Sequence, residues 1–531
     1  MIKWLLPLCL FTFLPLTATA QEREVIREGC MPTLDADDGD DGVAATRAAR
    51  RELSALRTSW DPQKVYRQAV VLVEFSDRSF SLEHPRETYD SIFNYSGFNR
   101  GAGPGCVAEY FQEQSGGAFN VQFDVFGPYK VNSKARVNSS ANEDTREYGK
   151  NVLAMATEAW IAEDKARDHS IYDWDNDMKI DQIIFVLASY SGNMGKDSLY
   201  GYVWPSTAEA PMIVYSIQTH DDYRINMTST SSELRANRTS WGLGTIIHEY
   251  SHCFGLPDIY PTGSNAGYSV VDEWDLMDGG NFINSGWCPP NYSGLERMLL
   301  GWQSPIELKE PTTITDMKPL SEGGPVYMVR HNDSEYYLLE NRQWSGWDAR
   351  IPGRGLAVFH VVYSASKWAN NSVNKDRANR CYQLVHADGL DYDAWDEIIG
   401  DNNPYVKGHS RFLSTSPYPY SAEESDVVND QLTDTSSPAS IMFNKNAAGS
   451  KYLSKAITNI RVSEDGLVSF DFMGGNQTGI EEKVHKENRP LCVVSVYDMG
   501  GRCVGSRLES QRPGIYIIRY SDGSTRKVVK K

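Results

Sequence analysis

The sequence predicts an α+β protein in which helices pack on a twisted sheet, followed by a β-rich extension and a small C-terminal β-sandwich. Two continuous apolar runs, AVVLVEF from Ala69 and IDQIIFVLASY from Ile180, have the length and composition of buried strands. The segment NVLAMATEAWIAED from Asn151 has the spacing of a helix. After residue 305 the chain changes to short alternating segments separated by turn residues, which predict strands.

The composition is that of a globular protein with more than one domain. The chain has 531 residues, of which 40% are hydrophobic and 23% are charged, enough for two or three domains with large cores. Its formal net charge of −18 argues against a nucleic-acid partner, because such partners require basic patches. The apolar runs inside the chain have the length of strands, so no transmembrane anchor is expected.

The N-terminal residues 1–20 are typical of a signal peptide. Lys3 supplies the positive start, Trp4–Leu16 the apolar segment and Ala18–Ala20 a small-residue cleavage site. Residues 21–62 are polar and include LDADDGDDG, which predicts a propeptide or linker. We therefore expect export, in which Cys9 of the eight cysteines leaves with the signal peptide. Export permits disulfides among the others, and the sequence leaves their pairing open.

Strands and helices alternate over residues 63–304. VAEYFQEQS from Val107 predicts a short helix, and NVQFDVFGPYKV from Asn120 predicts the strand after it. A further helix is expected around NYSGLERMLLGW, from Asn291. This succession is that of a sheet with helices packed on it.

An acidic loop precedes the second buried strand. YDWDNDMKIDQ carries four closely spaced carboxylates: Asp173, Asp175, Asp177 and Asp181. Carboxylates two apart in a tight loop can converge on one hard cation, and Lys179 would add its backbone carbonyl. The EF-hand pattern is not matched, since Met178 stands where that loop has its glycine. The loop predicts a calcium site, and a solvated acidic turn is the alternative.

The segment HEYSHCFGLPD, from His248 to Asp258, indicates a metal site on a helix. Residues four apart share one helix face, so His248 and His252 can bind one ion, and Glu249 can act as general base towards a coordinated water. Gly255 lets the chain leave the helix in a left-handed turn, after which Asp258 can return as third ligand. Three protein ligands plus a water are typical of catalytic zinc, and the predicted reaction is amide hydrolysis.

Two downstream residues bear on this site. Glu273 lies 21 residues beyond His252, close to the separation that thermolysin-like enzymes use, and is the alternative third ligand. Met277, in WDLMDGG, lies 25 residues beyond His252 and resembles the Met-turn of metzincin peptidases. A core methionine beside a glycine turn is the alternative for Met277. Gly255 and the Met-turn favour Asp258 over Glu273.

HEYSHCFGLPD, WDLMDGG and GLERMLLGW together resemble the immune inhibitor A family of secreted bacterial metallopeptidases. VVLVEFSD, AEYFQEQSGGAFNVQFDVFGPY, YDWDNDMKIDQ, EYYLLENRQ and PGRGLAVFHV extend the similarity over roughly residues 65–473. The resemblance implies a zincin/metzincin-like catalytic domain over residues 63–304, with residues 305–473 packed on it as an extension. Tyr250, Cys253 and Ile259 depart from the usual pattern, but none of them removes a ligand or the base.

The C-terminal region resembles another known domain. Residues 474–483 are a predicted linker, and residues 484–531 predict two hairpins of a small β-sandwich. VYDMGG, PGIYII and the closing KVVKK are similar to the C-terminal sorting domain of type IX secretion cargo in the Bacteroidetes. A small binding module is the alternative.

These features predict a secreted zinc-dependent endopeptidase that cleaves extracellular proteins or peptides. Expected partners are its protein substrates and the type IX secretion machinery, and the expected location is the medium or the outer-membrane surface. The alternative is a surface-displayed polymer-binding protein whose zinc site is vestigial or structural. A hydrolase of peptidoglycan or small peptides is a third possibility, which no wall-binding repeat supports. Glu249 discriminates between these classes, because a structural zinc site needs no general base.

Overall fold

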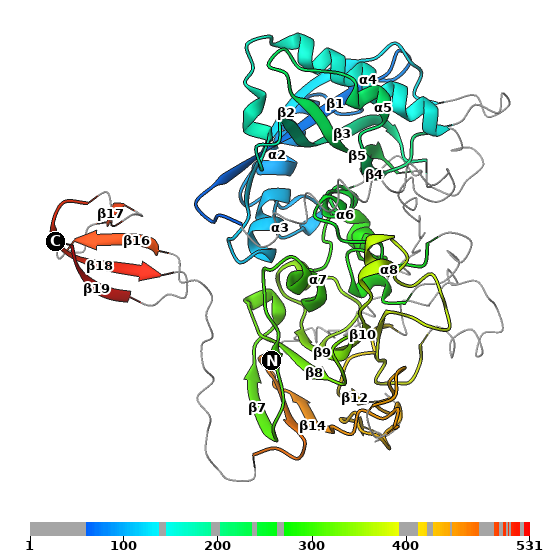
Figure 1. The fold of residues 1–531 in the computed structure, drawn as a ribbon, viewed down its shortest axis with the longest axis vertical. Helices are drawn as coiled ribbons and strands as arrows, with labels where there is room; N and C mark the ends of the chain where they lie inside the picture. Colours follow the sequence, from blue (N-terminus) through cyan, green and yellow to red (C-terminus); the bar gives the residue numbers. More distant parts are fainter. Residues whose placement is uncertain are drawn as a thin grey trace, which may run out of the picture.

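The computed structural model describes most of the chain beyond residue 59 (Figure 1). The described residues are 60–136, 145–192, 202–235, 240, 242–262, 270–391, 413–421, 428–446, 449–476, 493–498, 503–505, 508, 511–520 and 525–530. The predicted signal peptide and nearly all of the predicted propeptide or linker lie outside them. Within these ranges, the structure has no helix with the length and apolar character needed to cross a membrane.

The first sheet has five strands in the order β2-β1-β3-β5-β4. Its strands are β1 Val65–Glu74, β2 Asn120–Lys130, β3 Lys179–Tyr190, β4 Ser206–Glu209 and β5 Arg224–Leu234. β2, β1, β3 and β5 run parallel, whereas β4 pairs antiparallel with β5 at one edge. Both faces of β1 and β3 are buried, which is why these strands are continuous apolar runs in the sequence.

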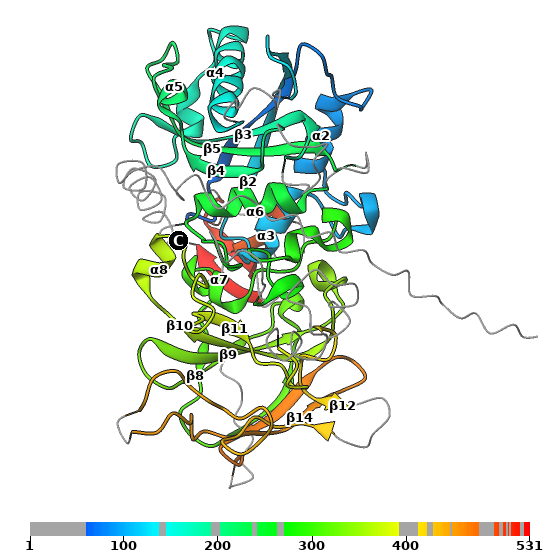
Figure 2. The same cartoon turned by 90° about the vertical axis from the view of Figure 1, so that its right-hand side faces the viewer.

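Helices cover both faces of this sheet (Figures 1 and 2). They are α2 Pro85–Asn94, α3 Val107–Gln114, α4 Thr145–Glu163, α5 Met212–Tyr215 and α6 Gly244–Cys253. Successive residues of β1 point to opposite faces of the sheet and so belong to different hydrophobic clusters. Val70 packs in the cluster that contains α2, α3 and α6, and Val71 packs in the cluster that contains α4. The helix α6 therefore lies on the face of the sheet opposite to α4.

The chain continues into two further sheets, preceded by α7 Gly294–Leu299. The five-stranded sheet β11-β10-β9-β8-β6 consists of β6 Ile306–Glu307, β8 Val326–Arg330, β9 Glu335–Arg342, β10 Gly355–Val362 and β11 Tyr382–Leu384. The three-stranded sheet β14-β15-β7 consists of β7 Thr312–Met317, β14 Ile457–Val462 and β15 Val468–Phe472. A short pair, β12 Tyr420–Ser421 with β13 Val428–Asn429, and the helix α8 Ala365–Ala369 complete this β-rich region.

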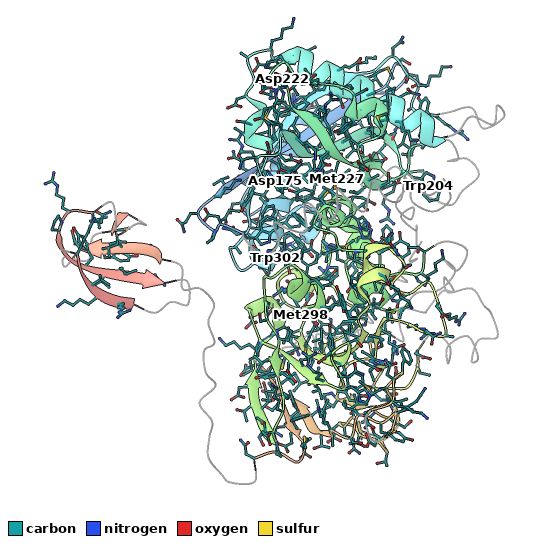
Figure 3. All side chains as sticks on the ribbon, viewed as in Figure 1. Asp175, Trp204, Asp222, Met227, Met298 and Trp302 are labelled. Atoms are coloured by element: carbon teal, nitrogen blue, oxygen red, sulfur yellow. The ribbon has the colours of Figure 1, made fainter. Side chains whose placement is uncertain are left out.

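The β-rich region and the first sheet share one hydrophobic core. A single cluster of buried residues contains Val70 of β1, Ile246 of α6 and Phe359 of β10. A second apolar cluster, which includes Phe470 of β15, fills the space between the two sheets of the β-rich region. Trp302, labelled in Figure 3, packs on Phe254 just after the end of α6, with ring centroids 6.2 Å apart.

Buried charges also cross the boundary at residue 304. The Arg342 guanidinium on β9 donates to both carboxylate oxygens of Asp348, at 2.7 and 2.8 Å. Asp348 in turn accepts a hydrogen bond from the Asn291 N–H at 2.9 Å, and Glu340 accepts one from the Gly294 N–H at 2.6 Å. Side chains of the β-rich region therefore satisfy the backbone at the start of α7, where a helix leaves N–H groups without intrahelical partners.

The described C-terminal residues form one four-stranded antiparallel sheet, in the order β17-β16-β18-β19. Its strands are β16 Val493–Asp498, β17 Cys503–Gly505, β18 Gly514–Tyr520 and β19 Thr525–Lys530. The predicted strands are thus present, but the part of the chain that the structure describes contains no second layer of a β-sandwich here. The predicted mixture of sheets and helices is present, but the first sheet is mainly parallel and has helices on both faces, which is an α/β arrangement.

Candidate metal centre

The helix α6 carries the first half of the predicted metal motif. All ten of its residues are buried, so the histidine face lies inside the protein and not on an open surface. Leu276 contacts His248 from one neighbouring segment, and Asn371 contacts Asp258 from another.

The ends of α6 are fixed by two glycines. An added Cβ at Gly244 would lie 2.1 Å from the Asn281 carbonyl oxygen, so only glycine allows the helix to begin this close to its neighbour. At the other end, Gly255 adopts φ +78° and donates its N–H to the His252 carbonyl at 2.8 Å. This confirms the predicted left-handed exit, which glycine adopts without the strain of a side chain.

The structure brings His248, His252 and Asp258 together. Asp258 Oδ1 lies 3.2 Å from His248 Nε2 and 3.2 Å from His252 Nε2. A zinc ion with ligand distances of about 2.0–2.1 Å in a tetrahedron separates its ligand atoms by roughly 3.3 Å. The two imidazole rings have centroids 4.9 Å apart and lie nearly perpendicular, at 86°. The spacing of the three atoms therefore fits one metal ion.

Two backbone carbonyls define the protonation of the histidine rings. Nδ1 of His248 lies 2.9 Å from the Leu276 carbonyl oxygen, and Nδ1 of His252 lies 2.7 Å from the Leu256 carbonyl oxygen. A carbonyl oxygen can only accept, so each Nδ1 carries the proton and a neutral ring then has a lone pair at Nε2. Both Nε2 atoms face Asp258, which is the arrangement that metal-binding histidines require.

Asp258 is a buried carboxylate whose two oxygens have different surroundings. Oδ2 accepts a hydrogen bond from Nδ2 of Asn371 at 2.7 Å, whereas Oδ1 makes no hydrogen bond among the described residues. Burial alone would raise the pKa of Asp258, but His252 and His248 outweigh it and lower the pKa below its ordinary value. An ionised oxygen and two imidazole lone pairs that converge on one point, away from water, fit a bound cation.

The predicted Met-turn lies against the first histidine. Met277 is fully buried, its N–H donates to Asp275 Oδ1 at 2.8 Å, and its carbonyl accepts from the Ile259 N–H at 2.8 Å. The turn closes with the Gly280 N–H donating to the Asp275 carbonyl at 2.9 Å. The turn is thus joined by hydrogen bonds both to His248, through Leu276, and to the residue after Asp258.

The two glutamates of the sequence prediction occupy different places. Glu249 follows His248 on α6, is 1% exposed, and its carbonyl accepts from Thr207 Oγ1 of β4 at 2.7 Å. Glu273 lies in the 3-10 helix η6 Asp272–Trp274 and is 5% exposed. In the described ranges, the cluster of potential metal ligands around His248 contains Asp258 and does not contain Glu273.

The acidic loop brings three of its four carboxylates together. Oxygens of Asp173, Asp175 and Asp177 lie within 4.8 Å of one another, on the loop that leads into β3 (Asp175 is labelled in Figure 3). Asp173 already accepts from the Asp177 N–H at 3.1 Å, and Lys179 Nζ lies 2.7 Å from Asp177 Oδ2. Burial and the neighbouring carboxylates raise the pKa of Asp175. The Lys179 ammonium therefore neutralises part of the negative charge in this loop that the predicted calcium ion would neutralise.

Asp181 and Met178 depart from what a calcium-binding loop would require. Asp181 is 3% exposed, and its Oδ2 accepts from the Trp174 N–H at 2.6 Å, so this carboxylate also has a structural partner. Burial raises the pKa of Asp181 well above its ordinary value. Met178 adopts φ +67°, in the left-handed region where an EF-hand loop has glycine.

One cluster was not predicted from the sequence. His169, His220 and Asp221 lie within 4.8 Å of one another, close to α4. Nδ1 of His169 lies 2.7 Å from Asp221 Oδ1, and the His169 N–H donates to Asp221 Oδ2 at 2.7 Å. That separation is a hydrogen bond, and it is shorter than the roughly 3.3 Å between two ligands of one tetrahedral ion. The cluster ties the start of the 3-10 helix η3 His169–Tyr172 to the loop before β5.

Comparison with known proteins agrees with this geometry. Residues 60–297 match the family model described as "Immune inhibitor A peptidase M6, catalytic domain". Immune inhibitor A of Bacillus thuringiensis subsp. alesti is 22% identical over 261 residues, which cover 42% of this chain and 38% of that protein. The chain thus spans well under half of that relative's length, and the family match ends before the β-rich region. The matched range includes α6, Asp258 and the Met277 turn, so residues 60–297 are similar to the catalytic domain of the immune inhibitor A peptidases.

Proposed function

We propose that this protein is a secreted zinc-dependent endopeptidase that hydrolyses peptide bonds in extracellular proteins, with His248, His252 and Asp258 as the zinc ligands. The observation that carries the proposal is the 3.2 Å spacing of Asp258 Oδ1 from both histidine Nε2 atoms. The catalytic-domain match supports the peptidase assignment, and M6 peptidases are zinc-dependent as a family. That its substrates are extracellular proteins is part of this proposal.

The protein residues have distinct roles in this scheme. When bound, zinc would polarise the scissile carbonyl and lower the pKa of a coordinated water. Glu249 takes a proton from the attacking water while the water oxygen bonds to the carbonyl carbon. Glu249 then returns that proton to the departing amide nitrogen as the C–N bond breaks. Asp258, whose pKa is lowered, stays anionic, and the Leu276 and Leu256 carbonyls keep the histidine Nε2 lone pairs directed at the centre.

The decisive test replaces the proposed base and keeps the ligands. Glu249→Gln removes the proton acceptor without a change in size, so the purified full-length variant should retain zinc while casein turnover falls by roughly 10²–10⁴-fold. Glu273→Gln is the matched control, because it makes the same change at another buried glutamate and should retain turnover. Zinc content would be measured by elemental analysis, and the cut sites by mass spectrometry, with and without a chelator.

The outcomes separate the candidate functions. Wild-type turnover in the Glu249→Gln protein would remove Glu249 from the mechanism. Zinc binding without any chelator-sensitive cleavage by the wild-type protein would favour the alternative, a surface-displayed polymer-binding protein with a structural zinc site. The match to a peptidase catalytic domain does not favour that alternative.

We also propose a route of export and a second metal. Residues 1–20 would direct the chain across the inner membrane, and residues 484–531 would be a sorting domain read by a type IX secretion machine. The mature enzyme would then reach the medium or the outer-membrane surface of a Bacteroidetes-like cell, with residues 21–62 as a propeptide or linker.

The second metal would be calcium, bound by Asp173, Asp175, Asp177 and Asp181 and by the Lys179 carbonyl. The carboxylate cluster supports this proposal, and the Lys179–Asp177 ion pair competes with it.

A further inference from the structure

The segment after α8 reaches from the β-rich region into the metal centre. The Asn371 side chain meets Asp258 twice: its Oδ1 accepts from the Asp258 N–H at 2.7 Å, and its Nδ2 donates to Asp258 Oδ2 at 2.7 Å. The orientation of the amide is fixed by its partners, because a backbone N–H can only donate and an ionised carboxylate can only accept. One side chain thus holds both the backbone and the carboxylate of the third proposed ligand.

Asn371 is itself held in place. It is 4% exposed, and its backbone carbonyl accepts from Thr262 Oγ1 at 2.8 Å. Three residues further on, Asn374 Nδ2 donates to the Ile259 carbonyl at 2.9 Å and to the Tyr382 carbonyl of β11 at 2.8 Å. The segment 371–374 therefore fastens the chain around Asp258 to the sheet of the β-rich region.

The backbone of Asn371 also restricts which residues can stand there. Its φ is +51°, in the left-handed region where asparagine, aspartate and glycine are tolerated better than other residues. Position 371 therefore combines an unusual backbone conformation with a side chain that can both donate and accept. Leucine or alanine would lose the amide and would also strain the backbone.

We infer that Asn371 is a positioning residue that makes Asp258 a monodentate metal ligand through Oδ1. The inference rests on the proposed zinc function of His248, His252 and Asp258. Because Oδ2 is engaged by Asn371 Nδ2, one carboxylate oxygen faces the histidines and the other is held away from them. A bidentate carboxylate would occupy a further coordination position, which a catalytic zinc site keeps for water and substrate. The β-rich region thus completes the metal centre of the catalytic domain.

The test compares variants matched to the backbone conformation. Asn371→Gly keeps φ +51° accessible and removes both hydrogen bonds, and Asn371→Asp keeps the size and the acceptor but sets a carboxylate against Asp258 Oδ2. Loss of such an outer hydrogen-bond partner typically weakens metal binding 10- to about 100-fold. We expect the zinc Kd of both full-length variants to rise within that range, with Asn371→Asp the weaker binder. Asn379→Gly changes an exposed asparagine between the segment 371–374 and β11, and this variant should bind zinc like the wild type.

The measurements are chosen to separate positioning from folding. Zinc Kd would be obtained by competition with a chelator, and the Tm of the metal-free proteins would be recorded alongside. Unchanged zinc affinity with a lower metal-free Tm would reduce Asn371 to a structural role and overturn the inference. Zinc X-ray absorption on the wild-type protein is the second measurement, and two carboxylate oxygens bound to the metal would also overturn it.

A further variant separates this inference from the proposed function. His248→Ala should abolish tight zinc binding if the metal lies at this centre. If His248→Ala binds zinc as the wild type does, the centre and the inference both fail. If zinc binding depends on His248 but the Asn371 variants bind it normally, only the inference fails. If zinc binding depends on both residues but casein is not cleaved, only the proposed activity fails.

Discussion

The Leu276 carbonyl oxygen lies 2.9 Å from Nδ1 of His248, so the turn that contains Leu276 and Met277 fixes the orientation of the first histidine ring. Leu276 and Met277 are adjacent, and the Met277 carbonyl accepts from the Ile259 N–H. The turn therefore touches the metal centre on both sides, at the helix and at the segment that follows Asp258. A substitution that changes the shape of this turn should therefore change the affinity of the centre for metal.

Gly280→Ala tests that connection. An added Cβ at Gly280 would lie 2.4 Å from the Asp275 carbonyl oxygen and 2.6 Å from Pro290, so the turn has to move. We expect a loss of roughly 1–3 kcal/mol in the free energy of unfolding, as for overpacking of a core, together with weaker zinc binding. Gly149→Ala in α4 is the control, since its Cβ would meet only Val203, at 3.5 Å. Urea unfolding and chelator competition provide the two readings, and normal zinc affinity in Gly280→Ala would separate the turn from the metal.

The third ligand can be decided by a pair of alanine variants. Asp258→Ala leaves two histidines for the metal, so zinc affinity should fall by at least 100-fold, which exceeds the ~10–100-fold cost of losing an outer partner. Glu273→Ala should leave zinc affinity close to that of the wild type, because Glu273 is not grouped with the histidines among the described residues. Chelator competition measures both. Loss of zinc in the Glu273 variant alone would establish the thermolysin-like arrangement instead.

Asp275 should make stability depend on pH. Its full burial raises the pKa to about 7, although the Met277 N–H lowers it and the Asp278 charge raises it further. An acid with a raised folded-state pKa binds its proton more tightly in the folded protein than in the unfolded chain, and this difference adds to the free energy of unfolding. The added stability is fully present below about pH 4, where the unfolded acid is protonated too, and it is lost as pH rises towards 7. Asp275→Asn should flatten this part of the decline in the free energy of unfolding, measured with urea from pH 4.5 to 7.5. The exposed Asp333→Asn variant should keep the wild-type slope.

Calcium should stabilise the protein if the acidic loop binds it. A ligand that binds only the folded state adds about 2.7 kcal/mol at 100 times its Kd, so thermal scans of zinc-loaded protein should show a higher Tm with calcium. The double variant Asp175→Asn plus Asp177→Asn removes two of the three clustered carboxylates and should lose the response. A double variant that responds as strongly as the wild type would exclude this loop as the site.

Removal of residues 484–531 should affect location and leave activity intact. If this region is a sorting domain, the truncated chain should accumulate as an active peptidase in the periplasm of a two-membrane host with type IX secretion. The full-length chain is the comparison, and each cell fraction would be assayed for chelator-sensitive casein cleavage. Normal levels of the truncated enzyme in the medium or at the surface would instead identify a binding or structural module.

The parts of the molecule that follow from local sequence were predicted well. The apolar runs that became β1 and β3 are buried on both sheet faces, and such strands show continuous hydrophobicity. The spacing of His248, His252 and Gly255 predicts a helix followed by a left-handed turn, because both features depend on a few neighbouring residues. The sequence did not choose decisively between Asp258 and Glu273, since either separation can be bridged by a loop.

The contacts that complete the centre could not be predicted in the same way. Asn371 lies 113 residues beyond Asp258, and its hydrogen bonds exist only once the β-rich region has packed on the catalytic domain. The Leu276 carbonyl is a backbone group that any residue type would supply, so no letter of the sequence identifies it. The pairing of His169 with Asp221 likewise joins residues 52 apart that share no local pattern.

The buried cluster of Arg342, Asp348 and Glu340 has a consequence for cleavage of the chain itself. A nick near residue 304 would not release a separable piece, because these charges are satisfied by the backbone of Asn291 and Gly294 on the other side of that boundary. Separation of the halves would leave buried charges and backbone N–H groups without partners, at a cost of several kcal/mol. A molecule nicked at this boundary should therefore stay assembled.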